Sequence, residues 1–335
     1  MDPGEQRVKV AIVGATGAVG REMKAVLEER KFPVSELRLL ASARSAGAVI
    51  DGIPVEEARP EAFDGIDVAL FSASSGIAQE LAPGIRDRGA WVIDNSSAFR
   101  ADSECPLVVP EINADSMREL KERGRGGIIA NPNCSTILLA MALHPLRSLA
   151  AIRRVVVCSY QAVSGAGAAA MEELQEQEKA EGRGEPPIPV VFPAVIAHNV
   201  VPWVGDIGPD GYSVEESKVR SELRRIFDSP DLPVAATCVR VPVWRAHAEA
   251  VHVELDREIA IREALDAYRE APGTVLHPVD FPTPRDVAGK DSVHIGRIRA
   301  DRAFDPGLAL WCVMDQLRKG AALNAIQIAE AVALR

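Results

Sequence analysis

The sequence predicts an α/β protein in which a doubly wound parallel sheet is joined to a second, α+β domain with a mostly antiparallel sheet. The chain has 335 residues, which suits two domains of roughly 150 residues each better than a single core. Apolar strand patterns alternate with helical patterns over about the first 130 residues, and strand-rich patterns return later in the chain. These observations together predict the two-domain α/β class.

The first half has the pattern of parallel β-α-β units. A continuous apolar run ending in glycine, "VKVAIVG" (8–14), is typical of a strand buried on both faces. The segment 21–30 follows with helical spacing, and further strands are expected at 37–42, 67–74 and 90–96. Because strands that alternate with helices pair in parallel, we expect a Rossmann-type nucleotide-binding domain here.

The pattern changes after "NPNC" (131–134). We expect a strand at 152–163, a helix at 167–182, a Pro-rich loop at 184–203, strands at 234–243 and 248–256, and a long helical segment at 309–335 broken at Gly320. The strands of this half are expected to be mostly antiparallel, with helices on one face. The predicted division assigns 1–132 and 319–335 to the nucleotide-binding domain, and 133–318 to a substrate-binding and dimerisation domain.

Composition excludes several classes of protein. The net charge is −10 and no Lys/Arg-rich patch is present, which argues against nucleic acid as a partner. The N-terminal segment lacks the apolar core of a signal peptide, and no run of about 18 apolar residues predicts a membrane span. The cysteines are odd in number and without metal-ligand spacing, so we expect no metal and reduced thiols in a cytoplasmic protein. They are Cys105, Cys134, Cys158, Cys238 and Cys312.

A glycine-rich turn, "GATGAVG" (14–20), lies between the first predicted strand and the first helix. Gly14, Gly17 and Gly20 would allow a tight turn and close approach of the backbone to a pyrophosphate at the helix N-terminus. A glycine turn alone is weak evidence and also occurs for purely structural reasons. The strand before it and the helix after it supply the context that a dinucleotide site requires.

The end of the second predicted strand indicates which dinucleotide is bound. NAD sites usually have Asp or Glu there, which bonds the ribose 2′-hydroxyl. Here the segment is "LLASARSAG", with Ser42, Arg44 and Ser45 and no acid. An arginine beside hydroxyl groups suits a 2′-phosphate, so NADP is favoured over NAD. The alternative interpretation is a solvated loop arginine.

Cys134 lies between a polar turn and an apolar helical stretch, "CSTILLAMAL". Asn133 suits the N-cap position, which would place Cys134 in the first turn, where the helix dipole favours a thiolate. A thiolate beside a nicotinamide suggests oxidation or reduction at the aldehyde level through a thioester. On this motif alone, a buried inert cysteine is an equally good interpretation.

Other candidates are weaker when taken singly. His247 has arginines and a glutamate near it, but by itself a core or surface histidine is the more common case. His252 is five residues away, which on one strand points it to the opposite face and argues against a shared metal site. Arg100 in "DNSSAFR" could hold an anion or simply be solvated. Glu215 and Lys218 lie three apart on a predicted helix and could form an ordinary surface ion pair.

In this order, the motifs closely resemble those of the aspartate-β-semialdehyde dehydrogenase family, in its compact bacterial branch. The resemblance covers essentially the whole chain and rests on nine strings in register. They are "VAIVGATGAVG", "ASARSAG", "DNSSAFR", "PEIN", "NPNCST", "SYQAVSGAG", "VRVPVWRAHAEAV", "PTPRDVAGKDSVHIGRIRAD" and "GAALNAIQIAE".

The resemblance implies NADPH-dependent conversion of L-4-aspartyl phosphate to L-aspartate 4-semialdehyde, within the biosynthesis of lysine, threonine, methionine and isoleucine by a homodimer. Cys134 matches the nucleophile that forms a thioacyl enzyme, Gln161 the residue that orients the acyl group, and His247 the general acid/base. Implied substrate contacts are Arg240 for the α-carboxylate, Glu215 for the ammonium, and Lys218, Arg100 and Asn133 for the phosphate. Implied cofactor contacts are Gly14, Thr16, Gly17, Ala18, Val19, Ser42, Arg44, Ser45, Ser72, Ser164, Gly165 and Asn324.

One implied pair of residues requires a break in a strand. Arg240 and His247 are seven residues apart, so an unbroken strand would point them to opposite faces. We therefore predict that Pro242 and the "VWRA" stretch interrupt the strand. The chain also departs from the family pattern, with "FSASSG" (71–76) in place of a more glycine-rich form and Ala248 where a serine often follows the histidine.

Two alternatives follow from the same fold. N-acetylglutamyl phosphate reductase shares the thioacyl chemistry, but its cysteine context differs from "NPNCSTI", and an acylated amine would not need Glu215. A non-catalytic NADP-binding relative would be expected to have lost the cysteine or the histidine, whereas Cys134 and His247 are both present.

Overall fold

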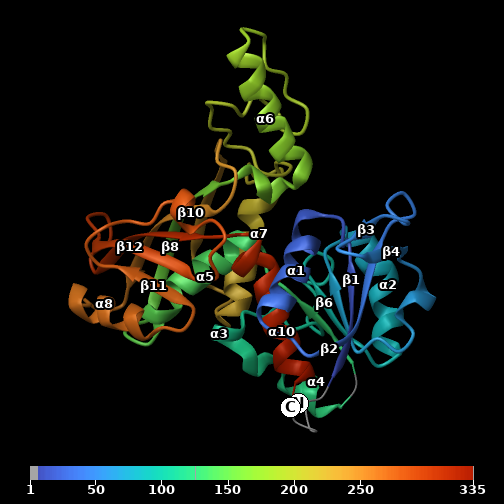
Figure 1. Ribbon diagram of the computed structural model, residues 1–335. Coiled ribbons are helices and arrows are strands. Elements are labelled where there is room, and N and C mark those ends of the chain that lie inside the picture. The colour runs from blue at the N-terminus through green and yellow to red at the C-terminus, as the bar shows by residue number, and fades with distance from the viewer. Residues whose placement is uncertain (1–6, 125, 335) are drawn as a thin grey trace. The chain divides into compact units, whose positions relative to one another are not determined.

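A computed structural model describes residues 7–124 and 126–334, and the chain divides into two compact units (Figure 1). One unit runs to Asn133 and resumes at Ala321, and the other is Cys134–Gly320. The sequence placed these boundaries at 132/133 and 318/319. The first residues of the segment considered for a signal peptide, 1–6, lie outside the described part of the chain.

The first unit contains a seven-stranded sheet in the order β3-β4-β2-β1-β5-β6-β7. All neighbouring pairs are parallel except the short β3–β4 pair. From β1 the chain moves outward through β2 on one side and through β5 and β6 on the other, so the strand order reverses at β1. The strands are β1 (Val8–Val13), β2 (Val34–Ala41), β3 (Val49–Ile50), β4 (Ile53–Glu57), β5 (Val68–Phe71), β6 (Trp91–Asp94) and β7 (Ile128–Ala130).

Helices cover this sheet and supply its core. Met23 and Val26 of the first helix and Ile326 of the last belong to one buried apolar cluster with the strand residues Val10 and Ile12. The 3.6-residue spacing of the apolar positions puts them on one face of each helix. The helices of this unit are α1 (Ala18–Glu29), α2 (Ser75–Asp87), α3 (Pro110–Asn113), α4 (Arg118–Glu122) and α10 (Leu323–Ala333), with 3₁₀ turns at Pro60–Phe63 and Ala114–Met117.

The second unit contains a six-stranded sheet in the order β11-β12-β13-β10-β8-β9. The three central pairs are antiparallel, while β8–β9 and β11–β12 are parallel. A parallel Rossmann-type sheet joined to a mostly antiparallel one confirms the predicted fold class. The strands are β8 (Ile152–Gln161), β9 (Val234–Arg240), β10 (His247–Leu255), β11 (Thr274–His277), β12 (Val293–Ala300) and β13 (Gly307–Met314).

Helix α5 (Cys134–Arg147) is the central helix of the second unit. It packs against β10, β12 and β13 and against two other helices, and nearly all of its side chains from Ser135 to Leu146 are buried. This explains why its sequence is apolar all round rather than on one stripe. The remaining helices are α6 (Ala168–Gly182), α7 (Val214–Ile226), α8 (Ile261–Glu270) and α9 (Pro284–Val287), with a 3₁₀ turn at Val163–Ala166 and a π-helical turn at Arg318–Ala322.

One predicted element is wrong. The segment 309–335 was expected to be helical with a break at Gly320, but its first residues belong to β13, which pairs with β10 and β12. The strand is buried along most of its length, so its apolar run has no alternation that would separate a strand from a buried helix. The helix α10 begins only at Leu323, after the π-helical turn.

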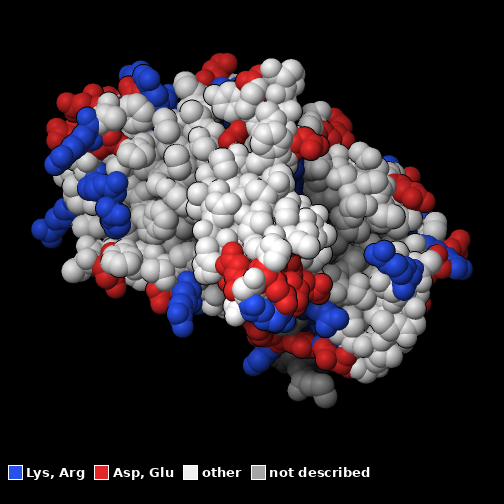
Figure 2. Space-filling view, turned by 90° about the horizontal axis from the view of Figure 1, so that it is seen from above, with Lys and Arg blue, Asp and Glu red and all other residues white. Residues whose placement is uncertain are grey.

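No helix in the described part of the chain is long and apolar enough to cross a membrane. On the face shown in Figure 2, Lys and Arg side chains lie in small groups among Asp and Glu, and large areas carry neither kind of charge.

Candidate functional site

The turn after β1 in the first unit is built from glycines for steric reasons. Gly14 has a φ of +82°, and a Cβ atom there would lie 2.2 Å from the carbonyl oxygen of Ser72. A Cβ atom at Gly20 would lie 2.3 Å from the carbonyl oxygen of Gly14, so α1 packs against the turn at close range. Helix α1 begins after Gly17 without a side-chain cap. A backbone turn of this kind, leading into a helix N-terminus, suits a pyrophosphate.

A cavity of about 560 Å³ opens beside this turn. Its lining includes Val13, Ala41 and Glu57, the last residues of β1, β2 and β4, so it lies at the carboxyl ends of the parallel strands. Open α/β sheets bind their ligands at this edge. Of the predicted cofactor contacts, the lining includes Gly14, Thr16, Gly17, Ser42, Arg44, Ser45 and Ser72.

The remaining predicted cofactor residues do not line this cavity. Ala18 and Val19 form the first turn of α1 next to it, and Ser164 and Gly165 belong to the second unit. Asn324 is fully buried in the first unit, where its Nδ2 donates to the carbonyl oxygen of Val108 (2.9 Å) and to Oδ1 of Asn131 (2.6 Å).

Two carboxylates of the cavity were missed from the sequence. Glu57 and Glu80 both line it, and Glu57 lies opposite Ala41 in the β2–β4 pair. An acid was expected only at the end of the second predicted strand, where NAD sites carry one. Strand β4, "IPVEE", was not predicted because it is short and contains a proline. Arg44 and Glu57 therefore share one cavity, and Glu57 also forms an ion pair with Arg59.

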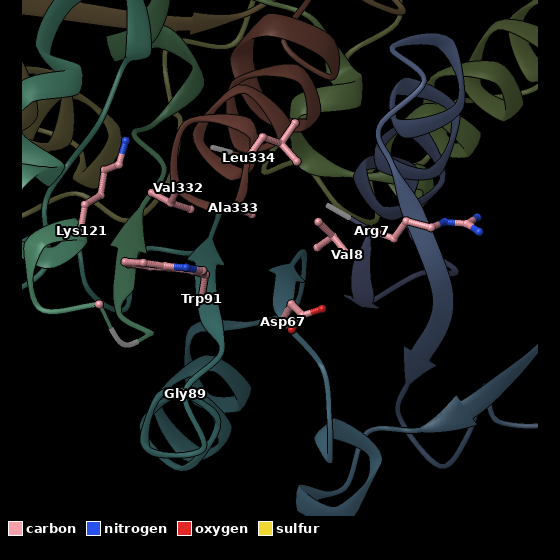
Figure 3. Close-up of a pocket in the computed structure, with 10 residues that line it drawn as sticks. Arg7, Val8, Asp67, Gly89, Trp91, Lys121, Val332, Ala333 and Leu334 are labelled. Atoms are coloured by element: carbon pink, nitrogen blue, oxygen red, sulfur yellow. The ribbon is translucent and has the colours of Figure 1, made fainter. Parts of the chain in front are cut away.

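A smaller cavity of about 280 Å³ lies at the opposite edge of the same sheet (Figure 3). It is lined by Val8 and Trp91, the first residues of β1 and β6, and by Ala333, the last residue of α10. Gly89, just after α2, and Lys121, near the end of α4, also line it. Because helix C-termini carry partial negative charge, this edge is less suited to phosphate groups than the glycine-turn edge.

Arg100 follows β6 in the first unit and is held by carbonyl groups. Its Nε donates to the carbonyl oxygen of Asn131 (2.9 Å) and Nη2 to that of Asn95 (2.6 Å). Asn131, from the "NPNC" stretch, thus contacts both Arg100 and Asn324. Asp94, fully buried nearby, accepts bonds from the amide and hydroxyl of Ser96, and burial raises the pKa of its carboxyl.

Helix α5 begins at Cys134, which confirms the predicted helix start directly after Asn133. The Cys134 side chain is half-buried, and a Cβ atom at Gly320 would lie 3.0 Å from its Cβ. The π-helical turn that contains Gly320 therefore packs closely on the cysteine. Because the rest of α5 is buried in the core of the second unit, the position of Cys134 is fixed by packing.

The predicted break between Arg240 and His247 is confirmed. Strand β9 ends at Arg240, and β10 begins at His247 after a loop in which Ala246 has a φ of +74°. The two strands lie on opposite sides of β8. Arg240 pairs with Gln161 of β8, and Ala248 pairs with Tyr160, so His247 lies beside Gln161. Residues in one cross-strand row share a face, so these three side chains project together.

His247 is fully buried and its protonation is fixed by the backbone. Its Nδ1 lies 3.0 Å from the amide nitrogen of Ala162, which can only donate, so Nδ1 accepts and the neutral ring carries its proton on Nε2. Nε2 has no hydrogen-bond partner in the described part of the chain. Burial, and then the charge of Arg240, hold the pKa of His247 well below its ordinary value.

Gly165 leaves room beside the imidazole and the guanidinium. A Cβ atom there would lie 3.0 Å from Nε2 of His247 and 3.0 Å from Nη1 of Arg240. Nη1 of Arg240 donates to the carbonyl oxygen of Ala162 at 2.6 Å. Burial lowers the pKa of Arg240, while the nearby charges of Glu215 and Cys134 act in the opposite direction.

The amide of Gln161 connects the sheet to the two helices of the site. Its Nε2 donates to Oγ of Ser135, the residue after Cys134, at 2.7 Å, and lies 3.3 Å from Oε1 of Glu215. Glu215 is in the first turn of α7, 3.9 Å from Nζ of Lys218, which confirms the predicted i, i+3 pair. The second unit thus brings Cys134, Gln161, Glu215, Lys218, Arg240 and His247 into one connected set.

A capping box fixes the start of α7. The hydroxyl of Ser213 accepts from the amide of Glu216 at 3.2 Å, and the Glu216 carboxylate accepts from the amide of Ser213 at 2.7 Å. The other oxygen of Glu216 accepts from the amide of Cys238 on β9 at 2.9 Å. This ties the helix to the sheet and sets the position of Glu215.

Several polar residues that support the site were not found from the sequence. Gln316 accepts from the amide of Ala246 at 2.8 Å and donates to the hydroxyl of Ser164, so it holds the loop before His247. Ser159 and Glu249 lie in the sheet beside the catalytic candidates. The described residues contain no group of three or more His, Cys, Asp or Glu that could hold a metal ion.

Two family models match the chain. The one described as "Semialdehyde dehydrogenase, NAD binding domain" matches residues 9–120, and "Semialdehyde dehydrogenase, dimerisation domain" matches 143–319. Aspartate-semialdehyde dehydrogenase of Aquifex aeolicus is 48% identical over 96% of this chain and 97% of its own length, and that of Bacillus subtilis 45% over 96% of each. A crystal structure of aspartate semialdehyde dehydrogenase II from Vibrio cholerae, complexed with ASA, superposes with a TM-score of 0.93 at 44% identity, over 97% of this chain and 98% of that one.

Proposed function

The chain belongs to the aspartate-semialdehyde dehydrogenase family of oxidoreductases, and from this premise we propose that it reduces L-4-aspartyl phosphate to L-aspartate 4-semialdehyde with NADPH, releasing phosphate. The observation that carries the proposal is the row formed by Arg240, Gln161 and His247 in the second unit, with Glu215 bonded to the same glutamine. An arginine, a carboxylate and a buried neutral imidazole suit an amino acid whose side-chain carbonyl reacts.

The charges of the site match the charges of the proposed substrate. Arg240 would bind the α-carboxylate, for which a planar guanidinium is well suited, and Glu215 would bind the ammonium group. Lys218, Arg100 and Asn133 are assigned to the phosphate on the family resemblance. A substrate with an acylated amine would leave the carboxylate of Glu215 without its counter-charge, which favours a free amino acid.

Cys134 would be the nucleophile. Its thiolate attacks the acyl carbonyl carbon, the C–O bond to phosphate breaks, and a thioester links the aspartyl group to the sulfur. Gln161, held by Ser135 beside the cysteine, would orient the acyl group. After reduction, the Nε2–H of His247 donates to the thiohemiacetal oxyanion. That oxygen re-forms the carbonyl as the C–S bond breaks, which releases the aldehyde and returns Cys134 as a thiolate. No step requires a metal ion.

The glycine turn and its cavity fit a dinucleotide, because the cavity opens between the turn at the start of α1 and the carboxyl ends of the parallel strands. When bound, the reduced nicotinamide supplies the hydride. Thr16, Gly17, Ala18 and Val19 would hold the pyrophosphate at the start of α1. Ser42, Arg44 and Ser45 support a 2′-phosphate and hence NADP, although Glu57 shares their cavity. Ser72, Ser164, Gly165 and Asn324 are proposed as further contacts on the family resemblance.

Oxidation of aspartate semialdehyde tests this function directly. With NADP and inorganic phosphate, the purified protein should produce NADPH at a rate that falls to background when phosphate is omitted. With NAD in place of NADP, kcat/KM should drop by tenfold or more. Absence of activity with both nucleotides would contradict the proposal.

The same premise supports a wider role. We propose a cytoplasmic homodimer that contributes to the synthesis of lysine, threonine, methionine and isoleucine, because residues 143–319 match a dimerisation domain and the cysteines are free thiols. A bacterial strain that lacks aspartate-semialdehyde dehydrogenase cannot grow on medium without these amino acids, and the gene for this chain should restore its growth there. Light scattering should give twice the mass of the chain, and a monomer would contradict this part.

A further inference from the structure

A fully buried carboxyl group, that of Glu249, lies directly beside the row of catalytic candidates and has no part in the reaction described above. Glu249 is two residues after His247 on β10, so both side chains project from the same face of the sheet. It pairs with Ser159 of β8 and Cys312 of β13, and Ser159 pairs with Cys238 of β9. These four residues form a second cross-strand row, each at most 2% exposed.

Among the described residues, little around Glu249 would stabilise a negative charge. Its Oε1 has no hydrogen-bond partner there, and its Oε2 lies 4.0 Å from the thiol sulfur of Cys312, a weak donor. No ion pair of Glu249 exists among the described residues. Burying an ionised carboxylate without a partner costs far more free energy than burying a neutral carboxyl.

The groups that face Glu249 come from several elements. They are Ser159 of β8, Cys238 of β9, Cys312 of β13, Glu215 of α7 and His247 of its own strand. Helix α5, whose buried residues are Ser135, Thr136 and apolar side chains, also packs against β10. The one acid among them, Glu215, makes ionisation of Glu249 still less favourable. Burial raises the pKa of Glu249 well above its ordinary value, and the charge of Glu215 adds to this effect.

The two rows are linked through Gln161. Its Nε2 lies 3.3 Å from Oγ of Ser159 and 3.3 Å from Oε1 of Glu215, so this amide connects the buried row to the carboxylate proposed to bind ammonium. A second negative charge in the buried row would attract the same ammonium group and would compete with Glu215 for it. The reacting carbonyl would then no longer be held at a single distance from Cys134.

We propose that the buried carboxyl of Glu249 keeps its proton in the folded protein at neutral pH, so that Glu215 alone presents a negative charge to the substrate's ammonium group. This inference rests on the proposed function for the identity of the ligand. The position of the proton, in contrast, is a property of the free protein.

Matched substitutions at the two members of the pair test the proposal. Glu215→Gln should raise KM for aspartate semialdehyde tenfold or more with a smaller change in kcat, because it removes the counter-charge. Glu249→Gln, which keeps the side chain neutral and similar in size, should leave KM and kcat within about twofold. A rise in KM with Glu249→Gln as large as that with Glu215→Gln would overturn the proposal.

Two measurements locate the proton without using activity. Infrared spectra at neutral pH should contain a protonated-carboxyl band that is absent in Glu249→Gln and retained in the control Glu254→Gln, on the same strand. The ratio of unfolding constants, wild type over Glu249→Gln, should grow by up to tenfold per pH unit as pH rises above about 4.5, because only the folded wild type retains the proton.

A missing band, or a ratio of unfolding constants that is constant with pH, would show that Glu249 is ionised and would overturn the inference. An inactive wild-type protein is a different result. It would reject the proposed function and the ammonium-binding part with it, while the infrared band would still decide where the proton lies.

Discussion

The two halves of this chain build their sites by different means. In the first unit, the turn beside the cavity is shaped by backbone packing, because Gly14 and Gly20 allow approaches that any Cβ atom would block. In the second unit, the candidate site is made by side chains that adjacent strands place in rows, with Arg240, Gln161 and His247 in one of them. Substitutions in the two regions should therefore fail in different ways. Those in the second unit should stop chemistry, and those in the first should weaken nucleotide binding.

The largest effect is expected at the nucleophile. Cys134→Ala should lower kcat/KM by at least about a thousandfold, because the thioester can no longer form. The affinity for NADP, measured by fluorescence titration, should stay within about twofold of wild type, since the glycine turn is untouched. Normal turnover in the Cys134→Ala variant would show that the reaction does not need this thiol, and would contradict the assignment of the chemistry to the second unit.

His247 should give the next largest effect. His247→Asn should reduce kcat by about 10²- to 10⁴-fold, the usual contribution of a general acid/base. The pH profile provides a second check. Because burial and Arg240 hold the pKa of His247 below its ordinary value, the ring stays neutral as pH falls through 6.5. The wild-type rate should therefore not fall as pH is lowered through 6.5. A fall in rate centred near pH 6.5 would contradict this placement of the imidazole.

Arg240→Lys tests the shape of the second-unit site. Loss of the planar guanidinium should raise KM for aspartate semialdehyde by roughly 10- to 100-fold, because a lysine cannot make two parallel bonds to a carboxylate. Arg220→Lys on α7, outside the connected set, is the matched control and should leave KM unchanged. If Arg240→Lys changed KM no more than Arg220→Lys does, the positive charge at position 240 would be sufficient and the planar shape of the guanidinium would not be required.

Gly14→Ala tests the backbone-built region and should give the smallest effect on chemistry. Its Cβ atom would collide with the carbonyl oxygen of Ser72 in addition to the strain of a positive φ, so stability should fall by about 1–3 kcal/mol and NADP should bind more weakly. Gly52→Ala is the control, since Gly52 has a φ of +81° but no atom within 4 Å of the added Cβ. Thermal unfolding of both variants separates the cost of the positive φ, which both share, from the cost of the collision, which only Gly14→Ala has. Equal losses of stability would contradict the collision with Ser72.

The same contrast explains what the sequence could and could not predict. The glycine turn and the helix start at Cys134 are local features, so residue type and spacing were sufficient to predict them. The break before His247 was predicted only because the family resemblance places Arg240 and His247 in one site. Glu57 and Glu249 reach their positions through strand pairing between distant segments, which no local pattern contains. The segment 309–314 was misassigned as helix because its apolar residues are buried on both faces in β13 and show no period.

The thioacyl mechanism at Cys134 can be tested by a rapid-mixing experiment without phosphate. Aspartate semialdehyde and NADP are mixed with wild-type protein, and NADPH is followed by absorbance while the quenched protein is analysed by peptide mass spectrometry. A thioacyl mechanism at Cys134 predicts a burst of one NADPH per site, an aspartyl group on the peptide that contains Cys134, and renewed turnover when phosphate is added. Steady NADPH production without phosphate, or a burst with Cys134 unmodified, would contradict it.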